Sequence, residues 1–157
     1  MMEHMAFKQA DISQKPVVFR SATAVGKIKL GPETMARVRE GRIEKGDPVS
    51  LARITSVIGA KQTSNLLALC HPLGIENTET ETRLMTDGIE VSVTVSAHEK
   101  TGVEMEALTG VSVALLNIWD VVKPYEKDAR GQYPRTEMRF LKVKEKVKRP
   151  FESARTA

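Results

Sequence analysis

Four ionisable side chains stand at the two ends of one apolar segment of the chain. Glu104 and Glu106 lie at its beginning, in the stretch 101–108 (TGVEMEAL), and Asp120 and Lys123 lie at its end. Carboxylates and ammonium groups can move protons and neutralise developing charge. Because a helix rises about 1.5 Å per residue, the segment from Glu104 to Asp120 should span about 24 Å, which is further than one small ligand reaches. If both ends serve one reaction, two subunits must share the site.

Two of these carboxylates also have a simpler explanation. Asp120 falls in the last turn of the predicted helix, where its charge opposes the helix dipole, so it either has a use or forms an exposed ion pair with Lys123. Glu104 either serves a site or completes a capping box with Thr101. Since residues two apart on a helix point in different directions, Glu104 and Glu106 are not a facing pair.

Two lysines stand where a cation could serve an anionic ligand. Lys45 precedes Asp47, a good helix N-cap, so it either reinforces phosphate binding at a helix start or is a loop lysine in water. Lys61 continues the apolar spacing of Ile54 and Ile58 and is therefore expected on the buried face of its helix. An ammonium there either snorkels to water or serves the site.

The segment 69–73 (LCHPL) holds a titratable imidazole close to an apolar run. His71 is either a structural histidine or a site residue. A Cys70–His71 nucleophile pair is not favoured, because adjacent side chains diverge. The histidines and the single cysteine show no metal-ligand spacing, so no structural metal is expected.

Composition predicts one domain over residues 1–157, with flexible tails at 1–15 and 144–157. The chain has 157 residues, of which 41% are hydrophobic and 28% charged, and no apolar run nears the length that crosses a bilayer. No secretory signal pattern is expected at the beginning, and one cysteine cannot form an intramolecular disulfide. A cytoplasmic protein is therefore expected.

The net charge of +4 favours anionic partners in general. Much of the excess lies in the basic run 142–149, which is expected to be a solvated end.

Hydrophobic periodicity and turn residues predict an α+β protein. Alternation predicts strands, an Asp87-Gly88 turn predicts a hairpin, and Pro124 is expected to end the long helix at Lys123. The expected order is strand 22–30, helix 32–41, helix 47–62, strands 75–85 and 89–97, helix 101–123 and strand 136–143. This order matches a ferredoxin-like split β-α-β arrangement, an antiparallel sheet with helices packed on one face.

Taken together, the segments 69–73 and 101–108, with Asp120 and Lys123, resemble the molybdenum cofactor biosynthesis protein C family, which is cyclic pyranopterin monophosphate synthase. The similarity runs from about residue 11 to residue 141. It implies an enzyme that takes the cyclised 7,8-dihydro-GTP made by a radical S-adenosylmethionine partner, rearranges it to a pyranopterin, closes a cyclic phosphate and releases diphosphate. It implies no resident cofactor and leaves open whether Mg²⁺ accompanies the triphosphate.

The family resemblance also implies an assembly and a set of site residues. The assembly is a homohexamer, a trimer of dimers with sites at subunit interfaces. As a hypothesis, we assign Asp120 as general acid/base and Lys45, Lys61 and Lys123 chiefly as phosphate anchors or proton donors. By matching motif, one subunit contributes Lys45, Asp120 and Lys123, and its neighbour contributes Leu69, Cys70, His71, Glu104, Met105 and Glu106, with Arg20 and Lys61 adding positive charge. The family's glycine-rich Gly-Gly-Lys-Ser-Gly run is absent here, and residues 142–146 (KVKEK) stand in its place.

Two other function classes are weighed against this resemblance. A basic ferredoxin-like sheet is also the scaffold of RNA-recognition domains, which stack bases on aromatic side chains. This chain has 4% aromatic residues, and the strand 89–97 has none. The third class is a non-catalytic oligomeric scaffold in which the helix motifs only form an interface.

Overall fold

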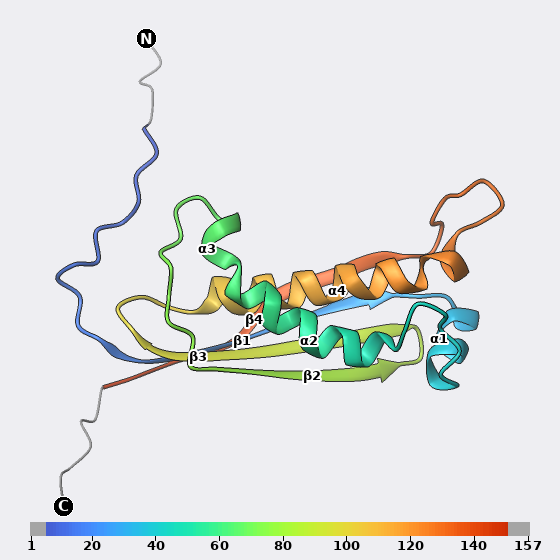
Figure 1. The fold of residues 1–157 in the computed structure, drawn as a ribbon, viewed down its shortest axis with the longest axis horizontal. Coiled ribbons are helices and arrows are strands. Elements are labelled where there is room, and N and C mark those ends of the chain that lie inside the picture. Colours follow the sequence, from blue (N-terminus) through green and yellow to red (C-terminus); the bar gives the residue numbers. More distant parts are fainter. Residues whose placement is uncertain (1–5, 151–157) are drawn as a thin grey trace, which may run out of the picture.

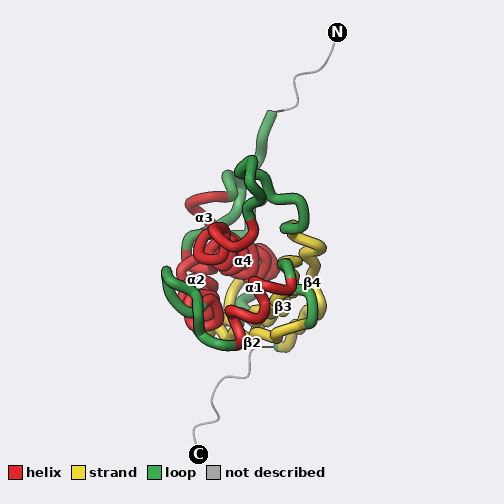
Figure 2. The backbone as a smooth tube through the Cα atoms, turned by 90° about the vertical axis from the view of Figure 1, so that its right-hand side faces the viewer, coloured by secondary structure: helices red, strands yellow, loops and turns green. Residues whose placement is uncertain are grey.

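The protein is described over residues 6–150 by a computed structural model, in which helices cover one face of an antiparallel sheet (Figure 1). Figure 2 shows the helices gathered on one side of the four strands, whose order is β2-β3-β1-β4. The elements are β1 (Val18–Lys29), α1 (Pro32–Arg39), α2 (Pro48–Lys61), α3 (Thr63–Leu66), β2 (Asn77–Met85), β3 (Gly88–Glu99), α4 (Glu104–Glu126) and β4 (Glu137–Arg149). Element order and sheet confirm the expected ferredoxin-like α+β arrangement.

The central strands β1 and β3 carry the sheet's half of the core. They pair along their whole length, with Ala24 opposite Val93, and the alternate apolar residues of 89–97 are fully buried. The predicted hairpin of β2 and β3 is confirmed. Gly88 follows the turn so close to β1 that an added Cβ would lie 2.0 Å from the Ile28 carbonyl oxygen, so only glycine fits there.

Two glycines let α2 and α4 approach each other closely. A Cβ on Gly59 would lie 2.7 Å from Val113 Cβ, and one on Gly110 would lie 2.9 Å from the Ser56 carbonyl oxygen. Small residues accordingly make the buried face of α2, namely Ala52, Thr55, Ser56, Gly59 and Ala60. The contact is therefore set by backbone proximity, with little room for large side chains.

The prediction that Ile54, Ile58 and Lys61 share the buried face of α2 is wrong. Ile54 is 61% exposed, Ile58 is 50% exposed, and Lys61 is exposed as well. The short distance between the two helices excludes broad side chains from the contact, so the isoleucines point away from α4. They leave an apolar strip on the outer surface of the helix layer.

The capping box predicted at the start of α4 is not formed. The helix begins at Glu104, with Val103 in the N-cap position and no side-chain cap. A capping box needs its acidic residue at the third helical position, whereas Glu104 occupies the first. The Glu104 carboxylate is consequently free to face a neighbouring strand, and it does so, as described below.

Pro124 does not end α4 at Lys123, because the helix continues to Glu126. A proline removes one helical hydrogen bond, and here the carbonyl that loses its donor is that of Asp120, four residues earlier. The helix nevertheless continues past the proline, and at its end the Lys127 N–H donates to the Lys123 carbonyl at 3.2 Å. The proline therefore removes the helical hydrogen bond to the Asp120 carbonyl without ending the helix.

The turn beyond Pro124 is held in place by the carboxylate of Glu126, which is 1% exposed. It accepts hydrogen bonds from the Gly31 N–H at 3.1 Å, from the Thr136 hydroxyl at 2.7 Å and from the Thr34 hydroxyl. Its donors come from the start of α1 and from the segment before β4. Such a buried and fully partnered carboxylate stabilises the helix end that the sequence pattern did not predict.

The expected tail from residue 144 is partly a strand. β4 runs to Arg149, which lies opposite Phe19 of β1, so residues 144–149 belong to the sheet. The reason is that β1 begins at Val18 and offers backbone partners over this length. The basic run is therefore an exposed edge strand instead of a solvated end, and residues 151–157 lie outside the described part.

By length and composition alone, α4 could cross a membrane, although no such segment was expected from the sequence. Half of its most apolar window is buried inside the protein, against the sheet and α2. A core helix of an α+β domain passes the same test.

Candidate active site

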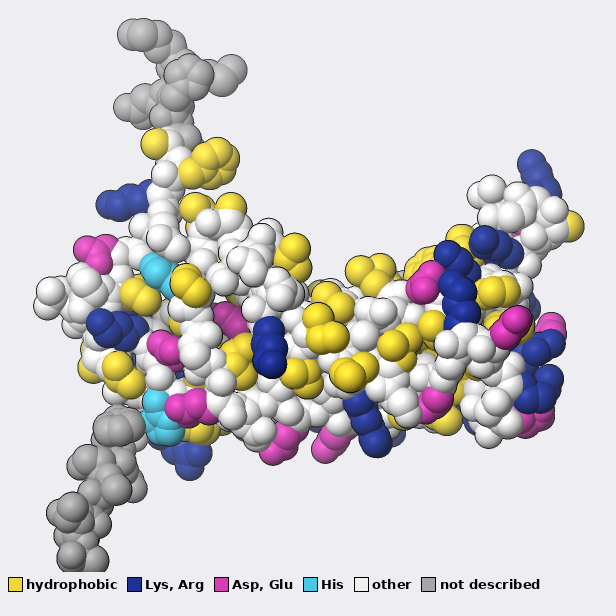
Figure 3. Space-filling model, viewed as in Figure 1, with side chains coloured by type: hydrophobic (Ala, Val, Ile, Leu, Met, Phe, Trp, Pro, Cys, Tyr) yellow, Lys and Arg dark blue, Asp and Glu magenta, His cyan; other side chains and the backbone are white. Residues whose placement is uncertain are grey.

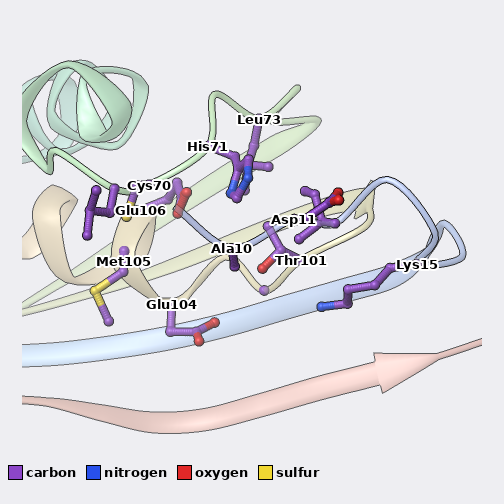
Figure 4. A pocket seen from close by; sticks show the side chains of 13 residues that line it. Ala10, Asp11, Lys15, Cys70, His71, Leu73, Thr101, Glu104, Met105 and Glu106 are labelled. Carbon is purple, nitrogen blue, oxygen red and sulfur yellow. The ribbon is translucent and has the colours of Figure 1, made fainter. Parts of the chain in front are cut away.

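A pocket of about 280 Å³ opens beside the first turn of α4. Three segments line it: the stretch before β1, the loop after α3 and the start of α4 (Figure 4). Its polar residues are Asp11, Lys15, Cys70, His71, Thr101, Glu104 and Glu106, and its apolar residues include Leu69, Leu73 and Met105. The structure thus brings together the two motifs that lie 32 residues apart in the chain, from position 69 to position 101.

The loop 67–74 presents its side chains to the pocket because it is anchored at both ends. The Cys70 N–H donates to the Leu67 carbonyl at 3.1 Å, which closes a turn directly after α3. The Gly74 N–H donates to the Glu99 carboxylate at 2.8 Å, which ties the loop to the end of β3. His71 is held half-buried between these anchors.

Glu106 is the most unusual group in the pocket. Its side chain lies beside Cys70 (Figure 4), it is 4% exposed, and one of its carboxylate oxygens is buried with no hydrogen-bond partner among the described residues. Burial raises the pKa of Glu106 to about 7, and the nearby charges of Glu104 and Glu99 add to this. At neutral pH the group can therefore either give or accept a proton.

The raised pKa of Glu106 predicts a stability that falls as pH rises. Between the ordinary value of 4.5 and about 7 the folded state binds the proton more tightly than the unfolded state, so the free energy of unfolding declines through this range. The loss should amount to about 3 kcal/mol by pH 8, and Glu106→Gln should remove it. Urea unfolding from pH 4.5 to 8 measures the difference, and the exposed Glu81→Gln variant should follow the parent. A parent curve that is flat, or that rises, over this range contradicts the assignment.

The thiol of Cys70 is not an activated nucleophile. Burial raises the pKa of Cys70, and the charges of Glu106 and Glu104 raise it further, so the group stays protonated at neutral pH. Within residues 6–150, no cluster of three or more histidine, cysteine, aspartate or glutamate side chains is arranged to hold a metal ion. The group in this pocket that can gain or lose a proton near neutral pH is Glu106.

Cations from β1 and β4 lie next to the pocket. The Lys146 ammonium lies 3.4 Å from Glu104, whose other oxygen is buried and unpartnered among the described residues. Arg20 donates to the Glu99 carbonyl at 3.2 Å and lines, with Lys146 and Lys148, a smaller hollow of about 100 Å³ that shares Glu104 with the main pocket. Of the lysines in the basic run, it is therefore Lys146 that contacts an expected site residue.

The second cluster lies at the opposite end of α4. The Asp120 carboxylate is 3.1 Å from the Lys123 ammonium and 3.4 Å from the Lys45 ammonium. These two neighbours, Lys123 first, hold the pKa of Asp120 below its usual range, so the group is a carboxylate at neutral pH. It borders an open hollow of about 380 Å³ together with Leu116 and Trp119. The exposed ion pair between Asp120 and Lys123 that the sequence offered as one explanation is therefore formed.

Within one chain the two clusters stay apart. Lys45, Asp120 and Lys123 meet at the end of α4, whereas Leu69, Cys70, His71, Glu104, Met105 and Glu106 meet at its start, with Arg20 alongside. Lys61 follows Ala60, which faces Gly110 in the first half of α4, so it belongs to the start. The two pockets at the start of α4 share no lining residue with the hollow at its end.

Sequence reasoning missed three residues at the pocket. Asp11 and Lys15 line it from the stretch before β1, and Lys146 reaches it from β4. The only signal for Asp11 is its place at the beginning of the family resemblance, and no pattern in the sequence marks Lys15. Lys146 depends on strand register, which places it opposite Ala22, and no local pattern predicts register for an edge strand.

The structure defines a ferredoxin-like α+β protein with a buried carboxyl of raised pKa at one end of its central helix and an exposed carboxylate between two lysines at the other. The model of the MoaC family matches residues 9–148. The chain belongs to the MoaC family.

Several relatives are similar to this chain over most of their length. The Pyrococcus horikoshii protein named "Probable cyclic pyranopterin monophosphate synthase" is 49% identical to this chain, and the match covers 94% of this chain and 92% of the relative. The corresponding protein of Sulfurisphaera tokodaii is 48% identical (90% and 93%), and that of Aeropyrum pernix is 50% identical (88% and 94%).

Proposed function

We propose that this chain is a phosphorus–oxygen lyase of molybdenum cofactor biosynthesis, a cyclic pyranopterin monophosphate synthase. It converts (8S)-3′,8-cyclo-7,8-dihydroguanosine 5′-triphosphate to cyclic pyranopterin monophosphate and releases diphosphate. Family membership and the names of the relatives support this reaction. They do not favour a nucleic-acid-binding module or a non-catalytic scaffold.

The observation that carries the proposal is the buried carboxyl of Glu106, unpartnered among the described residues, in a pocket lined by His71 and Glu104. Rearranging a reduced purine into a pyranopterin opens and closes rings, and each step needs a proton to be moved at a defined position. A carboxyl with a pKa of about 7 is suited to this, because it can both give and accept a proton at neutral pH. Leu69, Cys70 and Met105 provide the walls that would contact the purine-derived rings.

Closing the cyclic phosphate makes a bond from a ribose hydroxyl oxygen to the α-phosphorus and breaks the bond to diphosphate. The hydroxyl proton must leave, and the departing diphosphate gains negative charge. We assign the first task to Asp120, an ionised carboxylate at neutral pH, and the second to Lys45 and Lys123. Lys61 and Arg20 supply further positive charge for the phosphates.

These roles require two subunits. Since the groups at the start and the end of α4 are about 24 Å apart along the helix, one substrate can meet both sets only if they come from different chains. We infer a homohexamer, a trimer of dimers, in which His71, Glu104 and Glu106 of one subunit face Lys45 and Asp120 of another.

Exposed apolar side chains on the helix layer support an assembly of this kind. Ile54, Ile58, Leu66, Leu69 and Leu116 are between 45% and 64% exposed. Figure 3 shows hydrophobic side chains open to solvent along this face of the protein. Monomeric proteins rarely leave large contiguous apolar areas uncovered, so a partner of the same kind is expected there.

The pathway context completes the proposal. A radical S-adenosylmethionine enzyme supplies the cyclised substrate, and the reaction takes place in the cytoplasm. No resident cofactor is proposed, and Mg²⁺ is considered only as a companion of the triphosphate.

The direct test is to incubate the purified chain with the cyclised dihydro-GTP and to follow diphosphate and the cyclic phosphate product. One diphosphate per product is expected, and parallel reactions with EDTA test the role of Mg²⁺. Binding of the substrate without diphosphate release would indicate a scaffold, and tight binding of RNA without turnover would indicate the nucleic-acid alternative.

A further inference from the structure

Lys45 lies on a loop that needs an external support. The loop connects α1 to α2 and contains two glycines with positive φ, Gly41 at 68° and Gly46 at 136°. Ile43 is buried and anchors its middle. The Lys45 side chain itself is exposed, so the direction of its ammonium depends on how the backbone beside it is held.

Tyr125 holds this backbone from the last turn of α4. Its hydroxyl oxygen accepts a hydrogen bond from the Glu44 N–H at 3.0 Å, one residue before Lys45. The tyrosine ring is fixed in turn by the guanidinium of Arg37 on α1, which lies 4.5 Å from the ring centre. The loop is thus tied to the same helix that carries Asp120.

Pro124 contributes a free carbonyl to the same contact. The Asp120 carbonyl would normally accept the N–H of residue 124, but proline has none. The Lys45 ammonium lies 3.4 Å from this carbonyl oxygen and 3.4 Å from each carboxylate oxygen of Asp120. One ammonium therefore contacts both the main chain and the side chain of Asp120.

We propose that Tyr125 is a positioning residue that sets Lys45 against Asp120, and that Pro124 assists by leaving the Asp120 carbonyl open to the same ammonium. The inference rests on the proposed function for its catalytic meaning, because the two groups it aligns are those assigned to phosphate closure. Its geometry stands independently of that reaction.

The test uses Tyr125→Phe, which removes only the hydroxyl and keeps the ring under Arg37. In the substrate assay, kcat/KM should fall by about 2- to 10-fold, the loss that one ordinary hydrogen bond implies. The matched control is Tyr133→Phe, which removes the same atom from a ring that packs on Trp119. The control should keep the parent rate.

A readout without substrate separates this inference from the proposed function. The Asp120 carboxyl, selectively labelled with ¹³C and assigned with Asp120→Asn, is titrated by NMR. Lys45→Ala should raise the pKa of Asp120, since it removes one of the two cations that lower it, and Tyr125→Phe should raise it by part of that amount. Pro124→Ala, which restores the N–H, should shift it in the same direction.

The double variant Tyr125→Phe/Lys45→Ala tests whether Tyr125 acts on Asp120 through Lys45. If Tyr125 acts through Lys45, the double variant titrates like Lys45→Ala alone. The inference is overturned if Tyr125→Phe leaves the Asp120 titration unchanged, or if its effect persists in full without Lys45. If the titrations change as expected but the parent chain releases no diphosphate from the substrate, the inference stands and the proposed function is contradicted.

Discussion

Asp120→Ala is expected to lower diphosphate release by at least about 100-fold, which is the lower end of what a general acid or base contributes. The carboxylate is exposed and ion-paired in the last turn of α4, where its charge opposes the helix dipole. Removing it should therefore cost little or no stability, since exposed ion pairs contribute little. A folded, equally stable and inactive variant is the expected result, measured by thermal unfolding and by diphosphate release.

The matched control for this variant is Asp87→Ala. Asp87 also forms an exposed ion pair, with Lys27 at 2.6 Å, but it lies at the turn of the β2–β3 hairpin. It should keep the parent rate. Full turnover by folded Asp120→Ala would show that the assigned role is wrong, and equal losses in both variants would point to a general effect of net charge.

Mixing two inactive variants should restore activity. Asp120→Ala subunits keep an intact Glu106 pocket, and Glu106→Ala subunits keep an intact Asp120 cluster. If each site takes one set from each of two chains, random assembly of an equal mixture rebuilds about one quarter of the sites. Activity measured after the variants are unfolded and refolded together should rise from background to about that fraction of the parent.

The same experiment can contradict a shared site. Native mass spectrometry shows whether mixed assemblies have formed, with one variant labelled by heavy isotopes. Mixed assemblies without recovered activity would mean that the two clusters do not meet across an interface. A parent protein that turns over as a monomer would lead to the same conclusion.

Local patterns predicted the sheet and most helices because alternation and turn residues report directly on which face is buried. They misplaced the buried face of α2, where Ile54 and Ile58 outweigh the small residues in any hydropathy pattern. The true contact face is set by Gly59 and Gly110, and close approach of two backbones is a tertiary property. Helix ends were equally hard, since the end at Glu126 depends on donors from distant segments.

In the candidate site, too, local patterns identified some residues, whereas others depend on tertiary contacts. Asp120 was found because its charge opposes the helix dipole, and Glu106 because it is a carboxylate at the start of an apolar helix with no capping role. Lys146 and Tyr125 were not singled out. Their contacts arise from strand register and from the meeting of a loop with a helix end, and neither is encoded in residue spacing.

The buried carboxylate of Glu126 links the folding of this chain to its synthesis. Its hydrogen-bond donors come from residues 31, 34 and 136, so the last of them is synthesised after α4 has ended at Glu126. A nascent chain that stops short of Thr136 would bury this charge with a donor missing, which disfavours closure of the helix end. The final turn of α4 should therefore become native only once Thr136 has been synthesised, and the loop that carries Lys45, which Tyr125 ties to that turn, should become native with it.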